Sequence, residues 1–286
     1  SDQGNFDWTK TEAKLAPKLA KTNKAVIPGF YGSMPNGTIK TFSRGGSDVT
    51  GSIVARATKA KLYENWTDVS GCLICDPRIV NNPEPIKTIT YRELRELAYM
   101  GATVLHEDAI FPVRAAGIPV NIKNTNQPED RGTMIVSESA EHCDHIITGI
   151  AGKKGMSVIN IEKDKMNSEI GFGKNVLRAL EKSNVSFEHM PSGVDTMSVV
   201  IATEALAGKE TAIIDEIKSR VHPDQIYIES NLALIAVVGR GMKSARGTAA
   251  ILFSALADAR VNIKMIDQRV LQNLTLSLVL KKKILK

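Results

Sequence analysis

Five consecutive residues, Arg44-Gly45-Gly46-Ser47-Asp48, combine groups that bind and orient anions. Glycine has no Cβ, so its backbone can approach a ligand closely. Arginine pairs with a carboxylate through two parallel hydrogen bonds, and backbone amides can face an oxyanion. An anion site is therefore one interpretation of this turn. The other is a plain turn in which Ser47 and Asp48 cap the helix that follows.

The elements around this turn would place its amides at the start of a helix. Residues 38–42 are predicted to be extended, and apolar side chains recur with helical spacing between 49 and 61. The two glycines would then lie in a strand-to-helix turn. The first amides of such a helix, with the positive end of the helix dipole behind them, suit a bound anion. The motif is not the Gly-x-x-x-x-Gly-Lys-Ser/Thr sequence of a P-loop.

The three cysteines raise the question of a metal site. Cys72 and Cys75 form a C-x-x-C, and the sequence HCDH at 142–145 adds Cys143 with two histidines. Zinc is one interpretation, but no second C-x-x-C follows and residues 72–75 resemble a buried strand, so we expect no metal. So few cysteines indicate a reducing compartment, and we expect a cytoplasmic protein.

The composition is typical of a globular protein with two or three domains. Of its 286 residues, 43% are hydrophobic and 24% are charged. No apolar run is long enough to cross a membrane. The net charge of +6 owes much to the four lysines in the last six residues, and elsewhere the signs are mixed. Basic residues do not alternate with aromatic ones, so we expect neither nucleic acid nor a membrane as a partner.

Strands and helices alternate over roughly the first 140 residues. Strands are predicted at 25–33, 38–42, 61–71 and 118–125, and helices at 11–24 (interrupted near Pro17), 49–61 and, for the most part, 90–117. This alternation predicts an α/β domain with a largely parallel sheet. Ligands of such sheets bind at the carboxyl ends of the strands, where the turns Arg44–Asp48 and Thr67–Gly71 both fall.

The pattern changes near residue 146. From there we predict strands within 145–163, a helix (171–184), two strands (185–193 and 196–205), a helix (208–221) and a strand (225–230). This β-α-β-β-α-β order is that of a ferredoxin-like unit. A second copy begins at once, because GTAAILFSALADARVNIKMI aligns with GFGKNVLRALEKSNVSFEHM. Such an internal repeat predicts two similar domains in tandem.

Several motifs together resemble one enzyme family. In order, TFSRGGSD, NWTDVSG, DPRIV, ELRELAYMGATVLHEDAIFPV and GIPVNIKNT are similar to the second half of the catalytic domain of aspartate kinases. The repeated units resemble the two ACT domains that follow it in that family. The resemblance implies an α/β fold with three parts. These are part of an amino-acid-kinase (carbamate-kinase-like) three-layer domain over 1–140, a first ACT domain over 146–230, and a second, incomplete one over 231–286.

The resemblance also implies an activity. Aspartate kinases use ATP and Mg²⁺ to phosphorylate the β-carboxylate of L-aspartate to 4-phospho-L-aspartate, in lysine, threonine and methionine biosynthesis. A carboxylate is already a competent nucleophile, so alignment and charge neutralisation suffice for this transfer. The implied aspartate-binding residues are Arg44, Gly45, Gly46, Ser47 and Asp48, with Arg44 and Asp48 catalytic, and the implied ATP-binding residues are Thr67, Asp68 and Arg78. The alternatives are a turn cap for Asp68 and a surface charge for Arg78.

Two motifs of the family are absent from these residues. One is the Lys-x-Gly-Gly-Ser/Thr strand, whose lysine bridges the phosphates, and the other is the Arg-Gly-Glu helix that binds the substrate. We therefore expect an incomplete chain with little activity of its own. The alternative is a non-catalytic, ACT-containing regulatory subunit that binds amino acids and pairs with a complete subunit. An in-frame Lys-x-Gly-Gly strand upstream of Ser1 would favour the first interpretation.

ACT domains of this family bind an amino-acid end product and pair across subunits. The resemblance therefore implies lysine as the effector, alone or with threonine, and a homodimer formed through the ACT domains. The expected contacts come from a helix start and from the strand after it: Met166, Ser168, Glu169, Phe172, Gly173, Glu188 and Ser192. Helix-start amides would bind the carboxylate of the effector, and Glu188 or Glu169 an ammonium group. The alternative for Glu188 is an ordinary exposed strand carboxylate.

The last residues depart from the family pattern, which continues after Gln268 with Gly-Ser-Ser-Glu and a strand. Residues 269–286 read RVLQNLTLSLVLKKKILK instead. A choice of codons exists for which a shifted frame of this segment encodes Gly-Ser-Ser-Glu-Phe-Asn-Ile-Ile-Val. We therefore interpret the tail as the product of a two-base insertion or a one-base loss. This hypothesis predicts a second ACT domain without its closing helix and pairing face, and resequencing the locus tests it.

Overall fold

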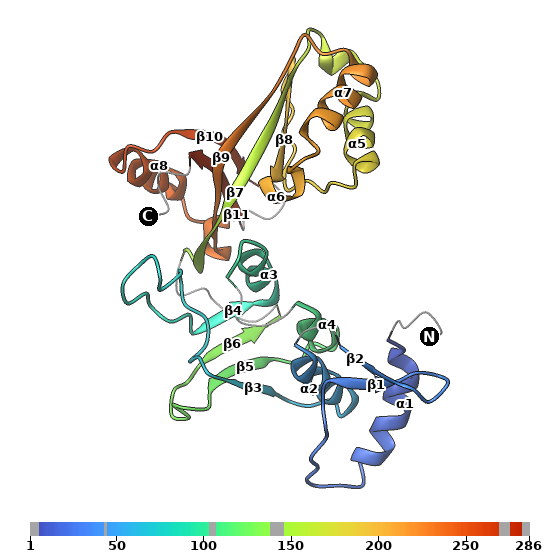
Figure 1. Ribbon diagram of the computed structural model, residues 1–286. Coiled ribbons are helices and arrows are strands. Elements are labelled where there is room, and N and C mark those ends of the chain that lie inside the picture. Colours follow the sequence, from blue (N-terminus) through green and yellow to red (C-terminus); the bar gives the residue numbers. More distant parts are fainter. Residues whose placement is uncertain (1–5, 43–44, 103–106, 138–145, 269–274, 282–286) are drawn as a thin grey trace. The chain divides into compact units, whose positions relative to one another are not determined.

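The computed structural model describes residues 6–42, 45–102, 107–137, 146–268 and 275–281. Within them the chain forms two compact units. Unit 1 holds residues 6–151 and the later segment Val237–Arg246, and unit 2 holds Gly152–Ala236, 247–268 and 276–281. Two strands, β7 (Gly149–Glu162) and β9 (Gln225–Val238), therefore run from one unit into the other (Figure 1).

Unit 1 contains a four-stranded sheet in the order β3, β5, β6, β4. Its strands are β3 (Tyr63–Thr67), β4 (Thr88–Thr90), β5 (Val120–Asn124) and β6 (Thr133–Val136). β3 runs parallel to β5 and β4 parallel to β6, but β5 and β6 are antiparallel. The prediction of a largely parallel sheet is therefore wrong at the centre. Only residues 125–132 connect β5 to β6, which is too short for a crossover between parallel strands.

The described residues of unit 1 also form the α-helices α1 (Trp8–Leu19), α2 (Gly46–Ala57), α3 (Tyr91–Tyr99) and α4 (Glu107–Ala115). α2 packs against α1, α4 and β3, while α3 packs against β4 and β6. Ile89 of β4, Ile122 of β5 and Ile135 of β6 are fully buried. α1 continues through Pro17 to Leu19, although the sequence predicts an interruption there. The proline lies in the last turn, where few residues follow it.

Two predicted strands of unit 1 are wrong. A buried strand was expected over 25–33, but only β1 (Tyr31–Ser33) forms, paired antiparallel with β2 (Ile39–Thr41). Val26 is fully exposed, and Pro28, which has no amide hydrogen to donate, interrupts the apolar run. Residues 72–75 form no strand either, since only Leu73 makes an isolated bridge, to Pro85.

Unit 2 contains a five-stranded sheet in the order β10, β11, β9, β7, β8. β8 (Thr196–Ala202) pairs antiparallel with β7, and β10 (Ile263–Gln268) pairs antiparallel with β11 (Thr275–Lys281). Helices α5 (Phe172–Lys182) and α7 (Glu210–Val221) lie side by side (Figure 1) and share an apolar core with β7 and β8. Unit 2 also holds the short elements η1 (Met166–Ser168) and α6 (Thr203–Leu206) and the helix α8 (Thr248–Asp258). The short element η2 (Arg240–Lys243) belongs to unit 1.

The ferredoxin-like pattern predicted after residue 146 differs from the structure in two places. Residues 185–193 form no strand, and two isolated bridges, His189 to Val200 and Ser192 to Met197, hold them along β8. Pro191 and Gly193 explain this, because both residue types weaken strands. The strand predicted at 225–230 continues without a break to Val238 as β9.

Residues 275–281 of the unusual tail form β11 and bury Leu278, Val279 and Leu280. Leu278 and Leu280 pack with Leu256 of α8 in a second, smaller core of unit 2. The tail thus adds a strand to the sheet, whereas the sequence predicts a departure from the ACT pattern from residue 269 onward. Residues 269–274 lie outside the described part of the chain, and the frameshift hypothesis stays a prediction.

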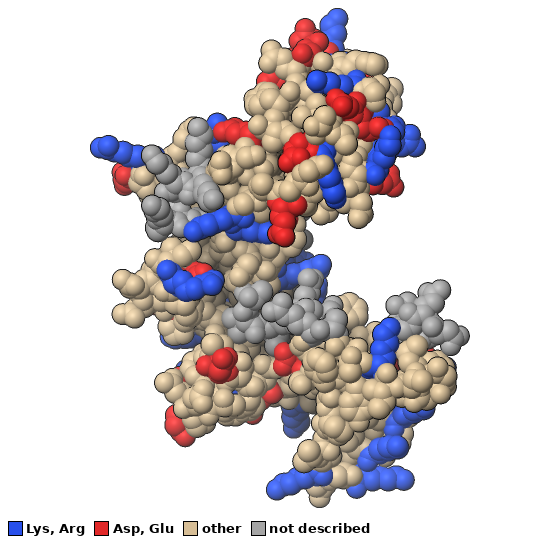
Figure 2. Space-filling view, viewed as in Figure 1, with Lys and Arg blue, Asp and Glu red and all other residues tan. Residues whose placement is uncertain are grey.

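Charged side chains of both signs are interspersed over the face of unit 2 that Figure 2 presents. Several of them are paired, as in Glu216, which accepts hydrogen bonds from Lys182 and Arg220. These bonds hold the pKa of the Glu216 carboxyl below its usual range. Within the described ranges, no helix is both long and apolar enough to cross a bilayer.

Candidate active site and effector site

The start of α2 carries the Gly-Gly turn. Gly45 adopts a left-handed conformation (φ 59°) as the N-cap residue, and no side chain caps the helix. A Cβ at Gly46 would lie 2.7 Å from Cδ2 of Phe30 and 2.9 Å from Cβ of Phe42, so close packing requires glycine there. Ser47 and Asp48 lie inside the helix rather than at its N-cap, so the capped-turn interpretation is wrong. Arg44 lies outside the described residues.

Asp48 is held by two residues of β3 that the sequence did not single out. The Asn65 side-chain amide donates to Asp48 Oδ1 (2.9 Å) and to the Tyr63 hydroxyl oxygen (3.1 Å), and the Tyr63 hydroxyl donates to the Asp48 carbonyl (3.3 Å). Asn65 is only 6% exposed. Burial and, to a smaller extent, the Asp48 charge raise the pKa of Tyr63, against a hydrogen bond from Asn65 that lowers it. These contacts fix the carboxylate at the start of α2.

The predicted ATP-binding pair Thr67–Asp68 lies at the carboxyl end of β3. The Thr67 hydroxyl donates to Asp68 Oδ1 (3.2 Å), and the Thr67 carbonyl accepts from both the amide (2.8 Å) and the hydroxyl (2.9 Å) of Thr125. Thr125 follows β5, the parallel neighbour of β3. Side chains alternate along a strand. Thr67 therefore lies on the same face of β3 as Asn65 and Tyr63, the two residues that contact Asp48 of α2.

Arg78 makes its contacts next to its own position in sequence. Its guanidinium donates to both oxygens of Asp76, at 2.7 Å for the shortest pair. Hydrogen bonds from Arg78 hold the pKa of Asp76 below its usual value. The Arg78 side chain is 85% exposed. Among the described residues, no hydrogen bond or ion pair joins Arg78 to Asp48 or to the Thr67 turn, so its contact with ATP stays a prediction.

The predicted effector residues divide between core and surface. Met166 of η1 and Phe172 at the start of α5 are buried, at 5% and 3% exposure, and belong to the core of unit 2. Gly171 caps α5 in a left-handed conformation with no side-chain cap. A Cβ at Gly173 would lie 3.5 Å from Cε of Met197, the residue that also bridges to Ser192. Gly173 and Ser192 are thus brought to the same residue of β8.

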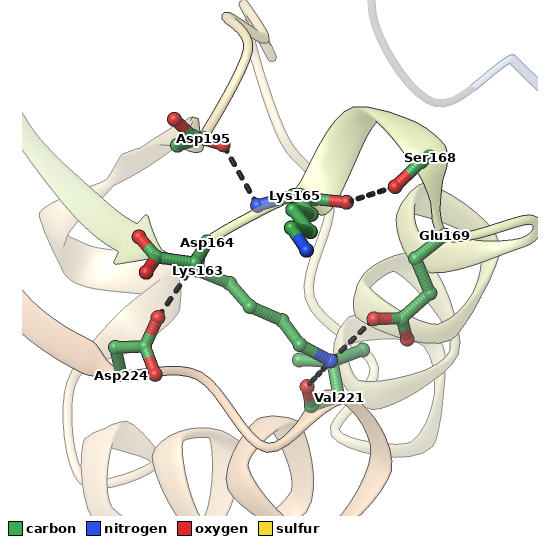
Figure 3. Close-up of polar contacts among 8 residues, drawn as sticks. All are labelled: Lys163, Asp164, Lys165, Ser168, Glu169, Asp195, Val221 and Asp224. Atoms are coloured by element: carbon green, nitrogen blue, oxygen red, sulfur yellow. Dashed lines mark hydrogen bonds and ion pairs between the residues drawn. The ribbon is translucent and has the colours of Figure 1, made fainter.

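Lys163 organises the turn that holds Ser168 and Glu169 (Figure 3). Its ammonium donates to the Glu169 carboxylate and to the Val221 carbonyl (2.6 Å), and lies 5.8 Å from the Phe172 ring centre. The Ser168 hydroxyl donates to the Lys165 carbonyl (2.8 Å). Glu169 is therefore already paired with a lysine of this chain. Apolar periodicity does not reveal this pairing, because it depends on how β7 ends beside α7.

Carboxylates also fix the backbone of this turn. The amide of Asp164 donates to Asp224 Oδ2 and that of Lys165 to Asp195 Oδ1, both at 2.8 Å (Figure 3). The turn is thus bonded both to the segment before β9 and to the segment before β8. A ligand at the start of α5 would meet a turn that is already ordered.

Glu188 differs from the exposed strand carboxylate that was its alternative. Its side chain is only 13% exposed, and Oε1 accepts a hydrogen bond from Lys153 of β7 at 2.9 Å. Its amide donates to the Val200 carbonyl (2.8 Å). Both acidic residues predicted to bind an effector ammonium therefore accept from a lysine of unit 2.

The cysteine motifs fall partly outside the described residues, which exclude 138–145 and with them Cys143. Cys72 and Cys75 are free thiols. Burial raises the pKa of the Cys72 thiol to about 12, against a weaker opposing effect of Thr133. Within the described ranges, no three side chains of His, Cys, Asp or Glu gather as metal ligands would.

Sequence comparison identifies two domain types. The model of the amino acid kinase family matches residues 4–124, and a model of the ACT domain matches residues 235–283. Aspartokinase 3 of Bacillus subtilis is 45% identical over 244 residues, which are 85% of this chain but 54% of that protein. This chain therefore spans about half of that relative's length.

Solved structures give the same result. The crystal structure of Clostridium acetobutylicum aspartate kinase matches 98% of this chain and 65% of its own, with 55% identity and a TM-score of 0.93. E. coli aspartokinase III in complex with lysine and aspartate matches 98% of this chain and 62% of its own, with 25% identity and a TM-score of 0.74. The chain therefore combines part of an amino acid kinase domain with ACT sequence, and over most of its length it is similar to aspartokinases.

Proposed function

We propose that this chain is part of an aspartate kinase, which transfers a phosphoryl group from ATP to the β-carboxylate of L-aspartate and feeds lysine, threonine and methionine biosynthesis. The single observation that carries the proposal is the start of α2. There an uncapped helix begins at two glycines, and Asp48 is held by Asn65 beside it. Uncapped amides at a helix start bind anionic oxygens, and both substrates of this reaction carry them.

Different residues of this chain would bind the two substrates. The amides of Gly46 and Ser47, with Arg44, would bind the carboxylate of aspartate, and Asp48 would bind its ammonium group. The Thr67–Asp68 turn at the end of β3 would bind the nucleotide, as ligands do at the carboxyl ends of strands. Mg²⁺ supplies neutralisation of phosphate charge, and it is commonly held largely by the phosphates themselves.

Catalysis is tested in a full-length enzyme that contains this chain, with aspartyl phosphate trapped as its hydroxamate. Asp48→Asn should lower kcat/KM at least about 100-fold, since loss of one charged contact to the reacting groups costs that much. Asp258→Asn, a matched change on α8, should leave the rate within about twofold. Equal activity of the Asp48→Asn variant and the parent would remove Asp48 from the site.

The isolated chain tests the incompleteness of the site. Because it lacks the Lys-x-Gly-Gly and Arg-Gly-Glu motifs, purified residues 1–286 should form aspartyl phosphate no faster than a blank. The proposal that this chain is an incomplete catalytic site would fail if it turned over at ordinary enzyme rates.

For unit 2 we propose an ACT-type effector site for lysine, alone or with threonine, and pairing of ACT domains in a homodimer. The likeness to E. coli aspartokinase III, whose structure contains lysine and aspartate, supports lysine. We keep the domain limits 1–140, 146–230 and 231–286. Glu188 and Glu169 both remain candidates for the ammonium, since each already accepts a hydrogen bond from a lysine of unit 2, Lys153 and Lys163 respectively.

Calorimetry with lysine tests the effector site. Glu188→Gln should weaken lysine at least about 10-fold, because a charge-assisted hydrogen bond to the ammonium is lost. Glu229→Gln is the control, since Glu229 also pairs with a lysine, Lys264, at 2.9 Å and lies in the same unit. Equal affinity of the Glu188→Gln variant and the parent would reject the assignment. Sedimentation in the presence and absence of lysine tests the dimer.

A regulatory subunit without catalytic activity is the second candidate, favoured by the absence of the two substrate-binding motifs from these residues. It predicts lysine binding without any binding of ATP. Trp66, 44% exposed and adjacent to Thr67, provides a fluorescence signal for ATP in a Trp8→Phe background.

We place the protein in the cytoplasm, which the free thiols of Cys72 and Cys75 support.

A further inference from the structure

Glu93, the third residue of α3, is completely buried and accepts four hydrogen bonds. Oε2 accepts from the amide (2.9 Å) and the hydroxyl (2.8 Å) of Thr90. The Glu93 amide in turn donates to the Thr90 hydroxyl oxygen (3.2 Å), which with the bond from the Thr90 amide completes the capping box of α3. Oε1 accepts from the Thr148 hydroxyl (2.6 Å) and from the Arg240 amide (3.0 Å), which lie 55 and 147 positions further along the chain. A capping box needs only the bond from the Thr90 amide to this carboxylate.

The carboxylate is charged at neutral pH although it is buried. Burial by itself raises the pKa of Glu93, but the hydrogen bonds from Thr148, Thr90 and Arg240 outweigh it and hold the pKa below its usual value. Hydrogen bonds to a charged acceptor are stronger than those between neutral groups. Thr148 and Arg240 are therefore bound firmly to the first turn of α3.

The two distant donors mark the ends of the strands that join the units. Thr148 immediately precedes β7, and Arg240 lies two residues beyond the end of β9. The amide of Thr148 also donates to the Val238 carbonyl at 2.8 Å. All of these residues belong to unit 1, and from them β7 and β9 continue into unit 2.

Glycines allow the chain segments to approach each other closely at this point. A Cβ at Gly149 would lie 2.7 Å from Cδ1 of Leu97 on α3. A Cβ at Gly239 would overlap the backbone of residues 146–148 and would lie 2.7 Å from Cα of Ile147. The start of β7 and the end of β9 therefore have no room to slide past each other or past α3 without breaking contacts.

We propose that Glu93 is a positioning residue that couples both strands to α3, so that an effector bound in unit 2 acts on the kinase residues by displacing Thr148 or Arg240 from this carboxylate. The inference rests on the proposed function, because it assumes an effector in unit 2. A shift of β7 also reaches the amide of Ile150, which donates to the Ile74 carbonyl at 2.6 Å, two residues before Asp76.

Two threonines provide a matched pair of variants. Thr90 and Thr148 are both buried, at 2% and 7% exposure, and each donates one hydroxyl hydrogen bond to Glu93. Thr148→Val removes the bond to the strand that enters unit 2, whereas Thr90→Val removes one inside the cap of α3. Thr148→Ser keeps the hydroxyl and should restore the parent behaviour. A merely structural role would not distinguish these variants.

The first measurement is hydrogen exchange in residues 1–286. Thr148→Val should speed exchange of the Ile150 and Arg240 amides at least tenfold, and Thr90→Val should speed exchange mainly in the first turn of α3. The second is inhibition of a full-length enzyme by lysine. Thr148→Val should shift the half-inhibitory concentration at least fivefold with kcat within twofold, while Thr90→Val and Thr148→Ser should leave it within twofold.

The outcomes separate this inference from the proposed function. Equal shifts for Thr148→Val and Thr90→Val, or no shift for either, would overturn the coupling. If neither lysine nor threonine inhibits the parent enzyme, the proposed effector is rejected, and hydrogen exchange alone tests the role of Glu93. Unchanged exchange at Ile150 and Arg240 in Thr148→Val would then refute the role of Glu93, and faster exchange there would support it.

Discussion

Asn65→Leu tests whether β3 holds Asp48 in place. The substitution keeps the side-chain volume but removes the donor that lies 2.9 Å from Asp48 Oδ1 and 3.1 Å from the Tyr63 hydroxyl. A hydrogen bond to a charged group contributes about 1.5–3 kcal/mol. Asp48 is partly exposed, so water replaces some of this, and we expect a loss of about 1.5 kcal/mol in the free energy of unfolding.

The assay is a double-mutant cycle in urea, with Trp66 fluorescence followed in a Trp8→Phe background. Asn65→Leu, Asp48→Ala and the double variant should give a coupling energy of about 1 kcal/mol, because the two side chains are in contact. Asn65→Leu combined with Asp258→Ala on α8 is the control and should couple by less than about 0.5 kcal/mol. A coupling between Asn65 and Asp48 no larger than the control would refute the view that this bond positions the carboxylate.

Three further predictions concern backbone, charge and thiol chemistry. Gly132→Ala should destabilise more than Gly117→Ala by about 1–3 kcal/mol in urea unfolding, because both have positive φ but only a Cβ at Gly132 meets the Ile122 carbonyl; equal losses would contradict it. Because the pKa of Glu93 is lowered in the fold, its charged form stabilises the protein above the usual carboxyl pKa of about 4.3, and this stabilisation is lost as the pH falls through the lowered value. In acid titrations of Glu93→Gln, the free energy of unfolding should lack the part of its pH dependence that Glu93 causes. An unchanged pH dependence would exclude Glu93 as its source. Burial raises the pKa of Cys72 to about 12, so iodoacetamide near pH 8 should label Cys75 before Cys72 in peptide mass spectra, and the reverse order would argue against this burial.

The sequence predicts short-range features well and long-range partners poorly. The helix after the Gly-Gly turn, strand β5 and helices α5 and α7 follow from apolar periodicity. The Thr67 turn follows from the polar end of the strand predicted at 61–71. The sequence does not predict Asn65 as a site residue, because its partner Asp48 is 17 positions away and contacts it only when α2 packs on β3. β5 and β6 are antiparallel because the loop between them, residues 125–132, is too short for a crossover. Apolar periodicity does not reveal the direction in which two strands pair.

The turn at residues 163–169 is a second case in which the sequence does not predict the partners of its side chains. Ser168 and Glu169 were expected to face a ligand, yet each is already bonded to a group of this chain. Lys163 provides one of those bonds, and periodicity identifies it only as a charged residue after a strand. Residues 185–193 have strand-like composition, but Pro191 and Gly193 leave only two bridges to β8.

The return of Val237–Arg246 to unit 1 has a consequence for synthesis of the protein. A ribosome adds about 5–20 residues per second, and 147 positions separate Glu93 from Arg240, so roughly 7–30 s pass between them. During that interval a nascent chain holds the Glu93 carboxylate without its last donor, and unit 1 is incomplete while unit 2 emerges. Unit 1 therefore cannot complete the hydrogen bonds of Glu93 until unit 2 up to residue 236 has been translated. A pause or a premature stop before residue 240 would leave the Glu93 carboxylate without the Arg240 amide.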